Sequence, residues 1–267
     1  MTKGAKTKYA VAKVAVFLFI CSTFAYGGAS CNVKGCNKYN AQNIALPQNQ
    51  TIGIYVNGTV PATVDGSTGA YAQALSTINS CSGATCQNGQ IGNGSGDTFA
   101  QYASQDQAAL SVNSNSAIVQ ITFNTTDTTP PSCNGSSDVV GCSTWSGSGG
   151  TANYGTIVIY LNSQQCGGPC FNSNAPGYAA AVQGVIQHEL YHGLGIGDTS
   201  SPGSIMSPYT VSSSGCDASS SSCFSSGGTP TPNNPAGTTT IQPCDNQTVQ
   251  AAATARACGC SCGKSKK

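Results

Sequence analysis

The sequence predicts one domain of the α/β (α+β) class. Its 267 residues are enough for a single sizeable core. Segments rich in β-branched residues predict strands, segments with Ala and Leu at helical spacing predict helices, and the two kinds alternate along the chain. We expect strands at 51–64, 116–126 and 154–162, and helices at 68–80, at 174–193 and from Pro243 onward.

The third strand, YGTIVIYLN at 154–162, is apolar on both faces between Ile157 and Leu161, which predicts that it is buried. The segment before it, 127–153, is rich in Pro, Ser and Gly and predicts a loop insertion. A similar composition at 212–240 predicts a surface loop. The main sheet is therefore expected to come from the other parts of the chain.

The clearest helix is 174–193. Asn174 suits the cap position, Pro176 suits the first turn, alanines follow, and Gly193 lies at the expected end. This segment also carries the chemically most informative residues of the chain.

The first 30 residues predict a secretory signal peptide. Four lysines precede an apolar run from Val14 to Phe24, and small residues follow. The run is shorter than the roughly 20 residues that span a bilayer. We expect a secreted, monomeric protein with no membrane span after the signal is removed.

Charge excludes nucleic acid as a partner. No basic residue occurs between Lys38 and Arg256, and removal of the signal leaves six basic against nine acidic residues. Phosphate contacts depend on Lys and Arg. The low proportion of charged residues, 7%, fits an extracellular protein better than a cytosolic one.

Cysteine usage agrees with export. Of the 15 cysteines, Cys21 lies in the signal, and ten of the other fourteen form close pairs, for which we expect short-loop disulfides rather than thiolate metal sites. The pairs are Cys31 and Cys36, Cys81 and Cys86, Cys133 and Cys142, Cys166 and Cys170, and Cys216 and Cys223. Cys244 and a Cys/Lys-rich tail at 257–267 hold the remaining four.

The segment HELYHGLGIGD, 188–198, contains both histidines and the only glutamate of the chain. On a helix His188 and His192 lie one turn apart on the same face, as needed to bind one metal ion. Glu189 points to the side, where it can hydrogen-bond a water at the metal. This combination is typical of H-E-x-x-H zinc hydrolases.

A catalytic zinc takes three protein ligands and leaves a fourth position open. Because the chain has no third histidine and no second glutamate, another donor must supply the third ligand. Asp198 is the nearest acidic residue, six after His192, and Gly195 between them can end the helix and let the chain turn back. We therefore expect Asp198 to be the third ligand.

The same segment resembles the extended metzincin pattern H-E-x-x-H-x-x-G-x-x-H/D, with aspartate in the last place as in snapalysin-like peptidases. SIMSPY, 204–209, is similar to the Met-turn of that clan, and its Pro208 is similar to the matrixin branch. PCDNQTVQAA, from Pro243, is similar to the closing C-terminal helix.

The resemblance implies a metzincin-like zincin fold. Its parts are a twisted mixed sheet, an active-site helix and a loop-rich, disulfide-stapled C-terminal subdomain. After a short N-terminal segment at 31–50, the catalytic domain would occupy 51–256, with the upper subdomain ending at about residue 195 and the lower one carrying the 212–240 insertion.

The resemblance also implies a function, that of a secreted zinc endopeptidase acting on a protein or peptide. Zinc on His188, His192 and Asp198 would polarise the scissile carbonyl and activate water, with Glu189 as general base and Met206 as an apolar floor. An edge strand preceding the active-site helix would pair with the substrate, and 154–162 is the candidate.

Other features of the resemblance are less complete. Structural calcium is common in the clan, but the scattered aspartates form no loop pattern that locates a site. Tyr209 lies one place beyond the position of a Met-turn tyrosine, so we do not expect it to bind zinc. The 31–50 segment is too short for the usual prodomain, and a disulfide between Cys31 and Cys36 is expected rather than a cysteine on the zinc.

Two alternatives stay open. An aspzincin also uses an aspartate ligand, but GIGDTSSPG lacks the Thr and the Tyr-Gly of that group's G-T-x-D-x-x-Y-G signature. A non-catalytic secreted Cys-rich binding or adhesion protein would explain the low charge and the cysteines. It would not explain why all His and Glu residues cluster at one helix end.

Overall fold

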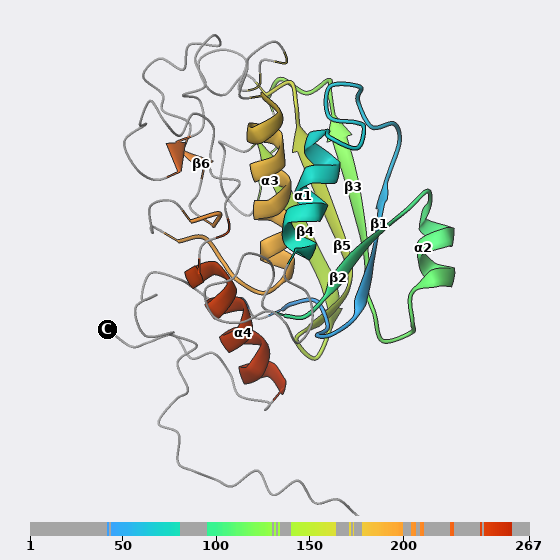
Figure 1. Cartoon of the computed structure of the whole chain (residues 1–267), viewed down its shortest axis with the longest axis vertical. Coiled ribbons are helices and arrows are strands. Elements are labelled where there is room, and N and C mark those ends of the chain that lie inside the picture. Colours follow the sequence, from blue (N-terminus) through green and yellow to red (C-terminus); the bar gives the residue numbers. More distant parts are fainter. Residues whose placement is uncertain are drawn as a thin grey trace, which may run out of the picture.

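The computed structural model contains a five-stranded mixed sheet with helices on both faces (Figure 1), which confirms the predicted α/β class. The strand order is β2-β1-β3-β5-β4; β4 is antiparallel to β5, and the other pairs are parallel. The structure describes residues 42, 44–80, 95–129, 131, 133, 140–163, 171, 173, 178–199, 204–206, 209–210, 225–226, 241 and 243–257.

Strands and helices follow one another through most of the described chain. The strands are β1 (Thr51–Val56), β2 (Thr98–Tyr102), β3 (Ile118–Asn124), β4 (Gly141–Ser148), β5 (Thr151–Tyr160), β6 (Tyr209–Thr210) and β7 (Ser225–Ser226). The helices are α1 (Ala70–Asn79), α2 (Gln105–Ser111), α3 (Tyr178–Gly193) and α4 (Pro243–Ala257). β6 and β7 form a separate antiparallel pair.

The period-2 pattern of the strands divides the sheet into two faces. On one face, isoleucines of β1, β3 and β5 are fully buried in the same apolar core as residues of α1 and α3. On the other face α2 packs against β1, where a Cβ at Gly53 would contact Ala108 and Val112. In Figure 1, α1 and α3 accordingly lie together and apart from α2.

Two predicted boundaries were wrong. The first strand ends at Val56 rather than at residue 64, because Gly58 has φ +94° and Pro61 starts a turn in which its carbonyl accepts from the Val64 amide. The predicted loop at 127–153 contains β4 and the beginning of β5, joined by a turn at 149–150. β2 and α2 were not predicted.

The third predicted strand is buried, as expected, but it is not the edge of the sheet. β5 lies between β3 and β4, and among the described strands β4 is the edge next to α3. The choice of 154–162 as the substrate-pairing edge strand was therefore wrong. Its apolar composition belongs to an interior strand, whereas the Ser- and Gly-rich sequence of β4 is tolerated at an edge.

One of the five predicted short-loop disulfides lies within the described residues and is confirmed, between Cys133 and Cys142. Cys244, at the beginning of α4, is also disulfide-bonded. The other four predicted pairs, the signal peptide, and the Asn174 cap with Pro176 fall outside the described residues. Within the predicted 212–240 loop the structure describes only Ser225 and Ser226, which form β7. No described helix has the length and apolar character needed to cross a membrane.

Candidate metal centre

α3 carries three of the predicted site residues, His188, Glu189 and His192. It packs against α1, β4 and β5, so the side chains of most of its second half are buried, including those of His188 and Glu189. The His188 and His192 rings lie on the same side of the helix, with centroids 4.6 Å apart and planes at 85°. The i, i+4 spacing therefore brings the two imidazoles together as predicted.

The turn after α3 brings the aspartate to this pair. The Gly195 amide donates to the His192 carbonyl and the Ile196 amide to the Tyr191 carbonyl, the two hydrogen bonds of a Schellman motif. Gly195 has φ +96°, the left-handed conformation that this motif requires. The predicted role of Gly195 in ending the helix and turning the chain is confirmed.

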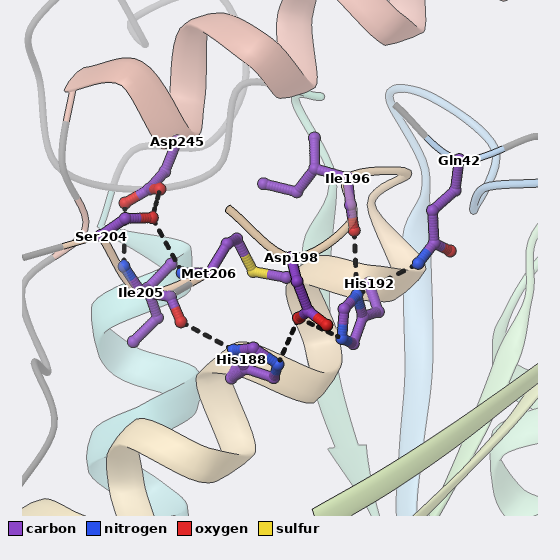
Figure 2. Close-up of polar contacts among 9 residues, drawn as sticks. All are labelled: Gln42, His188, His192, Ile196, Asp198, Ser204, Ile205, Met206 and Asp245. Carbon is purple, nitrogen blue, oxygen red and sulfur yellow. Dashed lines mark hydrogen bonds and ion pairs between the residues drawn. The ribbon is translucent and has the colours of Figure 1, made fainter. Parts of the chain in front are cut away.

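Asp198 then faces both histidines (Figure 2). Its Oδ1 lies 3.3 Å from His188 Nε2 and 3.5 Å from His192 Nε2. The Asp198 side chain is 57% exposed, whereas the histidine side chains are 8% and 15% exposed. The group is thus buried on the helix side and open to solvent at the aspartate.

Backbone carbonyls fix both imidazoles. His188 Nδ1 lies 2.8 Å from the Ile205 carbonyl oxygen, and His192 Nδ1 lies 3.0 Å from the Ile196 carbonyl oxygen. A carbonyl only accepts, so Nδ1 of His188 donates to Ile205 and carries a ring proton. His192 Nδ1 contacts both the Ile196 carbonyl and the Gln42 amide nitrogen, and both contacts hold its ring in place. Such contacts are typical of metal-binding histidines.

Met206 lies in the second turn that reaches the group. The Thr199 amide donates to the Met206 carbonyl at 2.8 Å, which ties this turn to the segment carrying Asp198. The Met206 side chain is fully buried, and Figure 2 shows it extending toward the group of His188, His192 and Asp198. This placement agrees with the apolar floor expected of Met206.

A buried carboxylate on α4 holds the same turn. Asp245 accepts from Ser204 Oγ at 2.5 Å and from the Ile205 amide at 3.3 Å, and Ser204 Oγ accepts from the Met206 amide at 2.9 Å. Because the Ile205 carbonyl contacts His188, a chain of hydrogen bonds runs from α4 to the imidazole (Figure 2). α4 is also attached to α3, since Tyr191 Oη donates to Asn246 Oδ1 at 2.9 Å.

Burial and the neighbouring charges set the protonation of the group. Burial alone lowers the pKa of His188, but the hydrogen bond to Asp198 and the negative charges of Glu189 and Asp198 outweigh it and raise that pKa. Burial and the charge of His188 lower the pKa of His192. Burial alone raises the pKa of Asp198, but the His188 hydrogen bond and the two histidine charges hold it below its usual value. The aspartate is therefore an anionic donor.

His188, His192 and Asp198 together could hold a metal ion, because all three of their ligand atoms lie within 4.8 Å of one another. They are the one such group of three or more His, Cys, Asp or Glu residues in the described part of the chain.

Glu189 lies beside the first residue of the edge strand. A Cβ at Gly141 would lie 2.8 Å from Glu189 Oε1 and 2.6 Å from Val185 Cγ1, so the glycine leaves the space that the carboxylate fills. The edge strand thus begins next to the glutamate.

The chain is not assigned to a family by similarity. No protein-family model matches it, and a search of curated proteins finds no match. The functional argument therefore rests on the residues and their geometry.

Sequence reasoning missed three residues near the group. They are Gly141, Asp245 and Gln42, whose amide nitrogen lies 3.1 Å from His192 Nδ1. Asp245 is the single acidic residue in the first turn of α4, which could have drawn attention to it. An acidic residue at this position, however, normally predicts an exposed carboxylate near the helix N-terminus. The side chain of Tyr209 is outside the described structure.

Replacing Gly195 by alanine tests how the turn positions Asp198. The left-handed conformation costs an L-residue about 1–2 kcal/mol, so we expect a lower free energy of unfolding and weaker metal binding as Asp198 shifts. Gly66→Ala is the matched control, because Gly66 has φ +92° and no atom within 4 Å of its added Cβ. Equal metal affinity in the two variants, by chelator competition, would contradict the assigned role.

Replacing Asp245 by asparagine tests the hydrogen-bond chain. The amide group has one acceptor oxygen in place of two, so it cannot accept from both the Ser204 hydroxyl and the Ile205 amide as the two carboxylate oxygens do. We expect metal affinity to fall about 10–100-fold, the usual effect of losing a hydrogen-bonding residue that orients a metal ligand. The exposed Asp65→Asn change is the control, and a folded Asp245→Asn protein with unchanged metal affinity would show that the chain of contacts does not position His188.

Proposed function

We propose that this chain is a secreted zinc endopeptidase of the metzincin type, with His188, His192 and Asp198 as ligands and Glu189 as general base. The observation that carries the proposal is the convergence of two histidine nitrogens and one aspartate oxygen at the end of α3. The only glutamate of the chain lies on the same turn of helix.

The two measured separations from Asp198 Oδ1 fit zinc. A tetrahedral ion with bonds of about 2.0–2.1 Å separates its ligand atoms by about 3.3–3.4 Å. The two nitrogens lie 3.3 and 3.5 Å from Asp198 Oδ1, close to this separation. Two neutral imidazoles and one carboxylate are also a donor set that zinc accepts, with the fourth position left open.

The residues of the chain divide the chemistry among them. Zinc, when bound, supplies a Lewis acid that polarises the scissile carbonyl and makes water more acidic. Glu189 takes the proton of the attacking water and passes it to the leaving amine nitrogen. The carbonyls of Ile196 and Ile205 hold the two imidazole rings through their Nδ1 atoms, with Nε2 of each ring toward Asp198, and the exposed side of Asp198 leaves the site open to substrate.

The substrate is proposed to lie along the edge strand β4. An extended peptide can add to a sheet edge through backbone hydrogen bonds, which bind it with little dependence on side chains. The first residue of β4 lies against Glu189, so a peptide paired with this strand passes the general base. This arrangement favours internal cleavage of an unfolded or extended segment.

Mass spectrometry of a casein digest tests the proposal. The secreted protein is expected to produce internal cleavage products, and 1,10-phenanthroline is expected to stop their formation because it removes zinc. No cleavage, or cleavage that persists with the chelator, would contradict a zinc peptidase. Absence of cleavage would favour a cysteine-stapled binding protein, and either result would exclude an aspzincin as well.

A further inference from the structure

A hollow lies on the face of the sheet that carries α2, and its lining includes no residue of the metal group. Its volume of about 460 Å³ is within the range of about 300–1,000 Å³ that is common for small-molecule sites. The residues lining it come from the ends of β1 and β2, the beginning of α2 and the middle of β3. Its polar lining residues are Tyr55, Asn57, Ser104, Gln105, Asp106 and Gln120.

The chain topology explains why a hollow forms here. After β1 the chain passes through α1 to β2, which lies on one side of β1. After β2 it passes through α2 to β3, which lies on the other side of β1. Since α1 and α2 cover opposite faces, the chain leaves the carboxyl ends of neighbouring strands β1 and β2 in opposite directions (Figure 1). Ligands of open α/β sheets commonly bind in the crevice at such a switch point.

The floor of the hollow is a connected polar network. Tyr55 Oη lies 2.6 Å from Gln120 Oε1 and 3.1 Å from Gln105 Oε1, and Tyr154 Oη donates to Gln120 Oε1 at 2.9 Å. Burial and the hydrogen bond with Tyr154 raise the pKa of Tyr55, so its hydroxyl stays neutral. These contacts fix the side chains before a ligand arrives, which lowers the entropy that binding costs.

The lining selects the class of ligand. Hydrogen-bond donors and acceptors come from the amides of Asn57, Gln105 and Gln120 and from the hydroxyls of Tyr55 and Ser104. Asp106 adds one carboxylate. No lysine or arginine lines the hollow, which disfavours phosphates and carboxylates, and the few apolar groups are too small a surface for an apolar molecule. Neutral groups that are both donors and acceptors match the hydroxyls of a sugar.

We propose that this hollow binds a neutral carbohydrate unit. The carboxylate of Asp106 accepts from sugar hydroxyls, the Gln105 and Asn57 amides bond to neighbouring hydroxyls, and the Tyr55–Gln120 network forms the floor. The site is independent of the proposed peptidase function, because its lining residues belong to the α2 face and include no member of the metal group.

Calorimetric titration with neutral oligosaccharides tests the site. The probes are maltotriose, cellotriose, mannotriose and triacetylchitotriose, and the protein is made without N-linked glycans because Asn57-Gly58-Thr59 is a glycosylation sequence. We expect at least one probe to bind, and Gln105→Ala and Asp106→Ala each to weaken it about tenfold through loss of a hydrogen-bonding group. Gln101→Ala and Asp65→Ala, which remove exposed groups outside the hollow, are expected to bind as the wild type does.

Three outcomes would overturn the proposal. The first is that no probe binds at about 10 mM, a concentration that detects even millimolar affinity. The second is equal binding by the wild type and the two hollow variants. The third is binding of inorganic phosphate in place of the sugars. Metal binding and hydrolysis by the Gln105→Ala and Asp106→Ala proteins are expected to be unchanged.

Discussion

Replacing Glu189 by glutamine is expected to reduce kcat/KM for peptide hydrolysis by about 10²–10⁴-fold, the usual contribution of a general base. Glutamine has nearly the same shape, so it fills the space beside Gly141 that the carboxylate occupies. It cannot accept the proton of water at neutral pH. Because Glu189 is not one of the metal-binding group, the variant is expected to retain its metal.

Asp65→Asn is the matched control for this change. It makes the same exchange of carboxylate for amide at an exposed position in the loop after β1. Hydrolysis should be unaffected there. Near-normal hydrolysis by a folded, metal-loaded Glu189→Gln protein would contradict the role of general base, and loss of metal from that protein would indicate that Glu189 acts as a ligand.

Replacing Asp198 by alanine is expected to have the largest effect on metal binding. It removes the only anionic donor of the group and leaves two imidazoles. The metal affinity should therefore fall by more than the about 10–100-fold that follows loss of a residue hydrogen-bonded to a ligand. Since the Asp198 side chain is 57% exposed, its removal leaves no deep cavity, and the fold should persist. Hydrolysis should be lost together with the metal.

Metal affinity by competition with a chromophoric chelator measures this effect, and circular dichroism checks the fold. Asp65→Ala is the control for removal of an exposed carboxylate. Metal affinity within a factor of a few of the wild type in folded Asp198→Ala protein would exclude the aspartate as a ligand. The site would then need a different third donor, and the resemblance to the extended metzincin pattern would lose its basis.

The sequence was sufficient to predict the centre of the site because its determinants are local. The i, i+4 spacing of His188 and His192 fixes their shared face, and a glycine three residues beyond the second histidine permits the Schellman turn that returns Asp198. The α/β class and the approximate places of β1, β3, β5, α1, α3 and α4 were likewise predictable from periodicity.

Contacts between distant segments were not predictable. Asp245 reaches the turn at Ser204 across 41 residues of sequence, and nothing in its local pattern distinguishes this buried acceptor from an ordinary helix-start acid. β4 was missed for a related reason. Pairing with β5 and the packing of Trp145, whose ring fits against Gly155 and Gly193, outweigh the weak strand propensity of its Ser and Gly residues.

Titration of metal-free protein with zinc, with bound metal and peptide hydrolysis measured on the same samples, tests the central claim most directly. We expect one tightly bound zinc per chain, and hydrolysis that rises in proportion to bound zinc and stops rising at one equivalent. Absence of tight zinc binding by the folded wild-type chain, or hydrolysis that does not depend on zinc, would contradict the account.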